Sequence, residues 1–379
     1  MILAHPLWSA AFRPFFLLGG VLAPLMLLYS FPGLHGDRFL WHGHEMLFGL
    51  AGGICTGFIL TALPSWGGAP AISRPRLALL FGVWLLGRLL AFAAGWLPPL
   101  VVALGDLALF PLLAAFTLPD ASRMRQKGFL ALAPILLALF LGNALFHFGL
   151  MRESDTIARH GLHLGLAGNI GLFGLVWGFL APTFTRTALQ ERGQDHRLGA
   201  PVWLEWASHL SLLAFLLSGL LLPDGVAAGM IALAAALIHL ARFLCWKFWR
   251  IVHIPIVSFL QLAYLWLVAV FALRAGADLW GWPPGLWIHA FTTGGLGMMM
   301  VAMLTRVSQR HTGRPFRTGA PYLLMGVLVT SGAGLRLAAV VSEQPQNLLI
   351  LAAILWGSVF PIFLLQSGSF LTSPSLPKE

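Results

Sequence analysis

Charged residues are scarce in this sequence. Only 9% of its 379 residues are Asp, Glu, Lys or Arg, whereas soluble globular chains average about 25%. Apolar residues make up 58%, which is more than a soluble chain of this size could hide from water. The two figures together exclude a soluble protein and indicate that lipid is the solvent for much of the chain.

Cysteine is almost absent as well. Cys55 and Cys245 are the only two, and neither belongs to a C-x-x-C pair. The sequence also lacks the C-x-x-C-H pattern that attaches haem covalently. Any haem would therefore be held without a covalent bond, and both thiols are expected to be small buried residues.

No polar stretch is long enough for a separate soluble domain, and the longest, residues 185–201, is predicted to be a loop. The formal net charge of +10 would suit a nucleic-acid binder. The basic residues, however, stand in short loops between apolar runs, which is the pattern that orients membrane proteins. We therefore expect a single transmembrane domain over residues 1–379, in a lipid bilayer and with no nucleic-acid partner.

Long apolar runs are abundant. Windows of about 20 apolar residues, enough to cross a bilayer, fall at 12–31, 42–63, 76–96, 98–117, 129–149, 160–182, 202–222, 225–245, 254–274, 286–305, 319–340 and 347–367. Twelve spans place most of the 23 Lys and Arg residues on one side. Because cytoplasmic loops carry the excess of basic residues, we predict an all-α helical bundle of about 12 transmembrane helices, with both termini in the cytoplasm.

Histidines gather near one predicted level of the membrane. They come from four spans and are His42, His44, His147, His160, His163 and His289. Imidazole is the usual axial ligand of b-type haem and also binds copper well. Ionisable groups inside a bilayer are costly, so they usually have a role or a partner. The pattern indicates a haem or copper site, or else ordinary interfacial histidines.

The spacing of these histidines refines the prediction. His160 and His163 are three residues apart, so they share a helix face and could hold one metal. His42 and His44 are two apart, so they converge only if the helix begins after them. Glu45 follows directly and could orient an imidazole by accepting its ring N–H.

Arg88 and Asp106 are predicted to lie inside neighbouring spans, about 10 and 13 Å from the same end at 1.5 Å per residue. Two explanations are open. The charges could pair and so offset the cost of burial, or Arg88, or Arg336 near the same level, could hold a haem propionate. The glycines at every fourth position of 49–57 likewise fit either close helix packing or a porphyrin plane.

Several motifs resemble the NnrS family, and they run in family order over about residues 12 to 317. The most specific are W-H-x-H-E-M within Trp41–Gly49 and H-T-G-R-P at His311–Pro315. The others are Phe12–Phe16, Gly57–Ala62, Gly87-Arg88, Pro182–Arg186, His289-Ala290 and Met303–Arg306.

The resemblance implies a multi-pass protein of the bacterial inner membrane that contains haem and copper. It also implies a link to nitric oxide, nitrosative stress and denitrification, with nitric oxide or an iron-nitrosyl species as the ligand. It supplies neither a reaction nor an electron donor. Two positions depart from the family pattern, Phe179 in place of an arginine and Gln261 in place of a histidine. If that histidine is a ligand, this member would bind one metal fewer.

We therefore predict a protein that binds haem b non-covalently, with copper as a further metal, and that takes part in the nitric oxide response. The metal-ligand candidates are His42, His44, His160, His163 and His289, with Glu45 orienting a ligand and Arg88 holding a propionate. A transporter of a small solute or metal complex stays open. So does a haem–copper oxidase-like electron-transfer enzyme, although the sequence has no adjacent His-His pair.

Overall fold

The computed structural model describes residues 2–30, 38–124, 127–222, 224–316 and 318–377. The chain is 84% helical, and the described ranges contain no strand. Within them, twelve helices are long and apolar enough to cross a membrane. The prediction of an all-α, multi-pass helical protein is confirmed, and the cytoplasmic placement of both termini stays a prediction.

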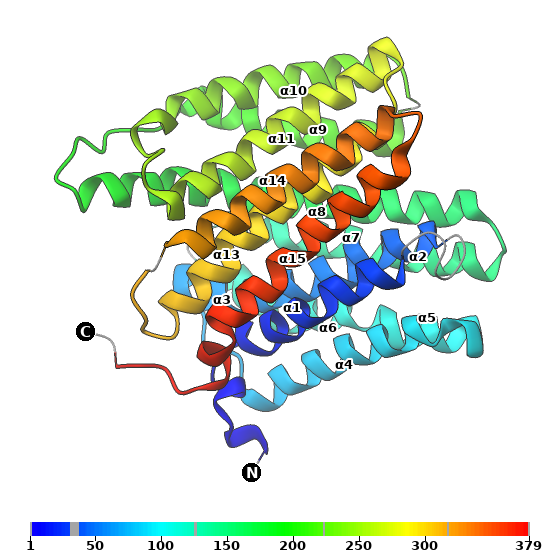
Figure 1. Ribbon diagram of the computed structural model, residues 1–379, viewed down its shortest axis with the longest axis horizontal. Helices are drawn as coiled ribbons and strands as arrows, with labels where there is room; N and C mark the ends of the chain where they lie inside the picture. Colours follow the sequence, from blue (N-terminus) through cyan, green and yellow to red (C-terminus); the bar gives the residue numbers. More distant parts are fainter. Residues whose placement is uncertain (1, 31–37, 125–126, 223, 317, 378–379) are drawn as a thin grey trace. The chain divides into compact units, whose positions relative to one another are not determined.

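The helices follow the predicted apolar windows (Figure 1). They are α1 (Phe12–Tyr29), α2 (Phe39–His44), α3 (Gly52–Gly67), α4 (Arg74–Phe92), α5 (Pro99–Leu107), α6 (Leu109–Arg123), α7 (Leu132–Met151), α8 (Asp155–Gln190), α9 (Val202–Leu221), α10 (Val226–Cys245), α11 (Pro255–Trp280), α12 (Gly285–His289), α13 (Leu296–Arg310), α14 (Ala320–Val341) and α15 (Pro345–Thr372). Two spans contain a π-helical segment, η3 (Glu45–Ala51) between α2 and α3, and η7 (Ala290–Gly295) between α12 and α13.

One predicted loop is partly wrong. Residues 185–201 are predicted to be a loop, but α8 continues as far as Gln190. The hydroxyl of Thr185 donates to the carbonyl of Ala181 at 2.8 Å, and Ala188 and Leu189 are buried. The segment is polar, which favours a loop, but residues 185–190 remain helical because one face of these turns is buried.

The chain forms two compact units. Unit 1 comprises Met1–Leu172, Val307–Pro315 and Phe363–Glu379, and unit 2 comprises Phe173–Arg306 and Phe316–Ile362. Three helices, α8, α13 and α15, contribute residues to both units. The expected single transmembrane domain over residues 1–379 stays a prediction.

In unit 1 the glycine face of the second span is filled by side chains. Gly49 lies against Arg88 and Gly53 lies against Trp84. Gly57 lies against Phe15. A Cβ added at Gly57 would come 3.0 Å from the Cβ of Phe15. These contacts with α1 and α4 confirm the helix-packing explanation of the glycine pattern.

Arg13 fixes the start of α1 in unit 1. Its guanidinium is fully buried and donates to the carbonyls of Leu371, at 3.2 Å, and Ser373, at 2.5 Å. The same C-terminal segment donates from the backbone N–H of Leu376 to the carbonyl of Thr312 at 2.9 Å. The last turn of α15 and the residues after it therefore accept the hydrogen bonds of Arg13 in the first span.

Helices α7 and α8 approach closely in unit 1. A Cβ at Gly142 would lie 2.7 Å from the backbone nitrogen of Gly165 and 2.8 Å from the carbonyl oxygen of Gly161. We expect Gly142→Ala to force the helices apart and to lower the free energy of unfolding by about 1–3 kcal/mol, measured by thermal unfolding in detergent. Gly82→Ala is the control, because nothing lies within 4 Å of its Cβ position. Equal losses in the two variants would contradict the prediction.

Unit 2 has a buried polar cluster of its own. Arg242 donates to the carbonyl of Gly178 at 3.0 Å and to the hydroxyl of Tyr264 at 3.3 Å, and it forms an ion pair with Glu205. Nδ1 of His239 lies 2.6 Å from the same hydroxyl. Because the charge of Arg242 is balanced and the contacts join α8, α9, α10 and α11, we interpret this cluster as structural.

Candidate metal centre

His44 lies where the second span changes from α2 to the π-helical segment η3. Its ring is buried and stacks on Phe146, with the ring centroids 4.4 Å apart. Nδ1 of His44 lies 2.9 Å from Oε1 of Glu45, the first residue of η3. π-helical segments often mark functional sites, and here the segment directly follows a buried histidine.

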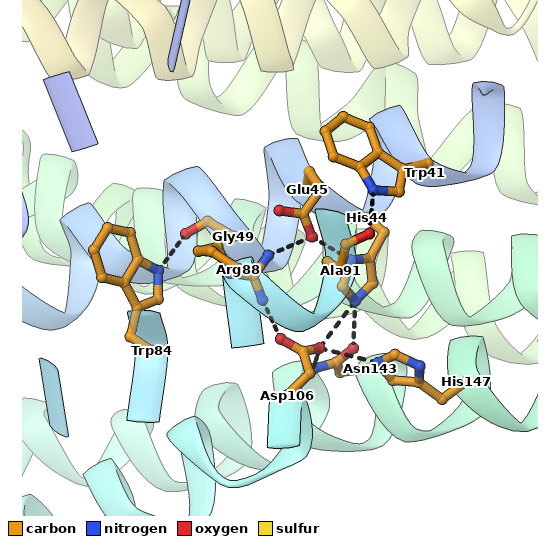
Figure 2. Close-up of polar contacts among 10 residues, drawn as sticks. All are labelled: Trp41, His44, Glu45, Gly49, Trp84, Arg88, Ala91, Asp106, Asn143 and His147. Atoms are coloured by element: carbon orange, nitrogen blue, oxygen red, sulfur yellow. Dashed lines mark hydrogen bonds and ion pairs between the residues drawn. The ribbon is translucent and has the colours of Figure 1, made fainter. Parts of the chain in front are cut away.

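Side chains from α5 and α7 face the other nitrogen of His44 (Figure 2). Nε2 lies 3.0 Å from Oδ2 of Asp106 and 2.9 Å from Oδ1 of Asn143. His147, one turn beyond Asn143, places its own Nε2 3.0 Å from the same Asp106 oxygen. Asp106 also accepts from the amide of Asn143 at 2.8 Å. All four residues are buried, so three spans supply one compact polar cluster.

Arg88 of α4 completes the cluster. Its guanidinium forms ion pairs with both Glu45 and Asp106, which confirms the explanation that pairs Arg88 with Asp106. The indole of Trp84 donates to the carbonyl of Gly49 at 2.8 Å and so holds α4 against η3. Both terminal nitrogens of the guanidinium are thus used by carboxylates of the protein.

The charges of this buried cluster leave a negative excess. Two carboxylates, those of Glu45 and Asp106, face one guanidinium. Both ring nitrogens of His44 lie at hydrogen-bond distance from a carboxylate oxygen, whereas a neutral imidazole can donate from only one. A proton on Nε2 would balance the buried cluster, and a metal ion at that position would supply at least the same positive charge.

The cluster contains a candidate set of ligands for a single metal ion. One ligand atom each from His44, Asp106 and His147 lie within 4.8 Å of one another, and the described residues contain no other such group of three His, Cys, Asp or Glu side chains. Two ligands about 2.0–2.1 Å from a tetrahedral metal are about 3.3 Å apart. The observed spacing of 3.0 Å from Asp106 to each imidazole requires only small adjustments.

A haem does not fit between these residues. The carboxylate of Asp106 touches both imidazoles, so a porphyrin plane has no room between them. The adjoining glycine face is filled by Arg88 and Trp84. The cluster therefore suits one ion and not a macrocycle.

The structure separates the two histidines of the W-H-x-H motif. Glu45 contacts His44 as predicted for an orienting group. His42 lies in the same short helix and places Nδ1 3.0 Å from the hydroxyl of Ser30. The two histidines do not converge, because α2 begins at Phe39, before both of them.

The other predicted ligands lie outside the cluster. His160 and His163 are on α8 within unit 1, and both side chains are exposed. His289 belongs to unit 2, where its Nε2 lies 2.6 Å from Nη2 of Arg336. Metal ligation by these three histidines and by His42 stays a prediction.

The ligands predicted from the sequence lack two of the three side chains of the candidate set, Asp106 and His147, and Asn143 was not predicted to take part in the site. Asn143 and His147 are four residues apart, so they share a helix face, and Asp106 interrupts an apolar run. These signals were present in the sequence. The sequence does not show that the helix faces carrying Asp106 in α5 and His147 in α7 point toward His44.

The fold and the cluster define a multi-pass helical membrane protein with a candidate metal centre inside unit 1. The profile of the family described as NnrS protein matches residues 6–375, nearly the whole chain. The chain therefore belongs to the NnrS family, as its motifs predict. No curated protein matches the sequence.

Proposed function

We propose that this protein is a metal-dependent membrane protein of the nitric oxide and nitrosative-stress response. In this proposal His44, Asp106 and His147 hold one transition-metal ion in the bacterial inner membrane, with both chain termini in the cytoplasm. The observation that carries the metal site is the approach of their three ligand atoms to within 4.8 Å. The link to nitric oxide rests on family membership.

Two imidazoles and one carboxylate are ligands that copper, iron and zinc all accept. Copper is the metal that the family resemblance implies, and the donor set fits it. Three protein ligands leave at least one coordination position open. A bound copper or iron ion would supply a centre at that position for nitric oxide, which partitions into membranes.

The surrounding residues have separate tasks in this proposal. Glu45 accepts from Nδ1 of His44 and so presents Nε2 to the metal. Arg88 offsets the two carboxylates, and Asn143 holds Asp106 through its amide. These contacts keep the ligands in place in a region that excludes water.

Haem b remains a second proposal that rests on family membership. It would have to bind away from the cluster, with His42, His160, His163 or His289 as the candidate ligands. The experiment below tests it directly, because protein with bound haem has a Soret absorption band and contains iron.

The test is metal analysis of the purified protein. We expect about one copper or iron ion per chain after metal loading and dialysis, and an absorption or electron paramagnetic resonance signal that changes with nitric oxide. His44→Ala should lose the ion. His209→Ala is the control, because His209 is an exposed histidine of α9. A wild-type protein that holds no metal after loading with copper, iron and zinc would overturn the proposal.

Transport is the alternative that one observation favours. Two of the twelve spans change from α- to π-helix, at η3 and η7, and irregular helices line substrate sites in many transporters. A small solute or metal complex would be the cargo. Uptake by proteoliposomes of a protein without bound metal would favour transport, and absence of uptake together with bound metal would favour the metal centre.

A further inference from the structure

A span in unit 2 has the same local arrangement as the span of His44, a histidine followed directly by a π-helical segment. In unit 1, His44 comes directly before the π-helical segment η3, and Trp84 donates to a carbonyl of that segment. In unit 2, His289 comes directly before η7, and the indole of Trp356 donates to the carbonyl of Thr293 at 3.1 Å. Each unit thus holds a buried π-helical segment headed by a histidine.

In each unit an arginine of the following span contacts the start of this motif, Arg88 at Glu45 and Arg336 at His289, but the charges differ. Arg88 is balanced by two carboxylates, one of them Glu45. Arg336 of α14 donates from Nη2 to Nε2 of His289 at 2.6 Å. The residue after His289 is Ala290, and no carboxylate of the described chain lies within 4.0 Å of Arg336.

This unbalanced charge lies inside a membrane-crossing helix. The side chain of Arg336 is half-buried, and its Cα is about 7.5 Å along the axis from the last residue of α14 at 1.5 Å per residue. An unpaired cation is costly there. Arg242 and Arg274, two other arginines within helices of unit 2, are both paired with carboxylates. Arg336 therefore lacks the carboxylate partner that Arg242 and Arg274 have.

Two further donors near η7 have no acceptor. The indole nitrogen of Trp287, two residues before His289, is buried without a hydrogen-bond partner. The indole nitrogen of Trp266 is also buried without a partner, and the ring of Trp266 lies against Gly294 of η7. A buried donor left unpaired costs about 1–3 kcal/mol. The region is thus rich in donors and poor in acceptors.

We propose that Arg336, together with His289, binds an oxyanion. The source is a small free oxyanion or the phosphate of a lipid headgroup, since a guanidinium binds both through charge-assisted hydrogen bonds. Because Nε2 of His289 accepts from Arg336, its ring proton is on Nδ1, which lies 3.4 Å from the hydroxyl of Thr292. A metal ion at Nε2 would meet the positive charge of Arg336, so this side chain pair favours an anion. The inference is independent of the metal centre in unit 1.

The test uses the full chain in dodecyl maltoside, a detergent that carries no phosphate. Sodium formate and sodium nitrate are titrated against sodium chloride at constant ionic strength, and thermal unfolding is followed. A small-anion site predicts a saturable rise in the unfolding midpoint. The apparent affinity should fall at least tenfold in Arg336→Gln and less in Arg336→Lys, which keeps the charge. Arg310→Gln, which removes an exposed arginine, should respond as wild type does.

A second arm adds phosphatidylglycerol to the protein in the same detergent. A rise in the midpoint that Arg336→Gln and Arg336→Lys reduce, without any response to formate or nitrate, identifies the headgroup phosphate as the ligand. If neither arm gives a response that depends on Arg336, the proposal is wrong. Arg336→Lys keeps this test decisive should Arg336→Gln fail to fold.

Discussion

Replacing Arg88 with methionine should lower the free energy of unfolding by about 3–5 kcal/mol, the usual loss when one partner of a buried ion pair is removed. Arg88 is buried and pairs with both Glu45 and Asp106. Without it, two carboxylates remain in surroundings that exclude water. The loss is measured by chemical or thermal unfolding in detergent.

Two further variants separate charge from packing. Arg76→Met removes an exposed arginine from the same helix and should change stability by less than about 1 kcal/mol. The double variant Arg88→Met with Glu45→Gln removes one of the stranded charges as well, so it should recover part of the loss. Equal stability of Arg88→Met and Arg76→Met would show that the ion pairs contribute little.

His147→Ala should abolish metal binding, whereas His160→Ala should leave it unchanged. Partners that only orient a ligand are worth about 10–100-fold in metal affinity, so we expect a direct ligand to be worth more than 100-fold. Both histidines belong to unit 1, but only His147 is buried against Asp106. The metal content per chain after loading and dialysis gives the result, and circular dichroism verifies that both variants remain folded.

The reverse outcome is equally informative. If His160→Ala loses the metal and His147→Ala keeps it, the pair His160 and His163 predicted from their spacing is the site. The cluster around Asp106 would then be a structural network balanced by a proton. Loss in both variants with retained fold would indicate a metal whose ligands extend beyond the three proposed here.

The membrane-crossing helices could be predicted because their positions depend on one property, the length of an apolar run. An apolar run of about 20 residues has one stable solution in lipid, and all twelve predicted runs correspond to membrane-crossing helices. The end of α8 could not be predicted in the same way. Thr185 and Gln190 belong to a polar segment, and whether such a segment stays helical depends on the neighbours that cover its buried face.

The candidate site was only partly predictable for a related reason. His44 and Glu45 are adjacent in sequence, so their contact is local and the motif indicates it. Asp106 and His147 come from other spans, and nothing in the order of residues tells which faces of those spans meet. The pairing of Arg88 with Asp106 could be predicted, because consecutive spans run antiparallel and the two charges have similar predicted depths in the membrane.

The contacts of Arg13 have a consequence for the order in which the protein is made. Two of its hydrogen-bond acceptors are the carbonyls of Leu371, in the last turn of α15, and Ser373, just after that helix. The buried guanidinium of the first span therefore cannot form these hydrogen bonds until residues 371 and 373 have been synthesised. A ribosome that stalls before residue 371 would therefore release unit 1 without the contacts that hold Arg13.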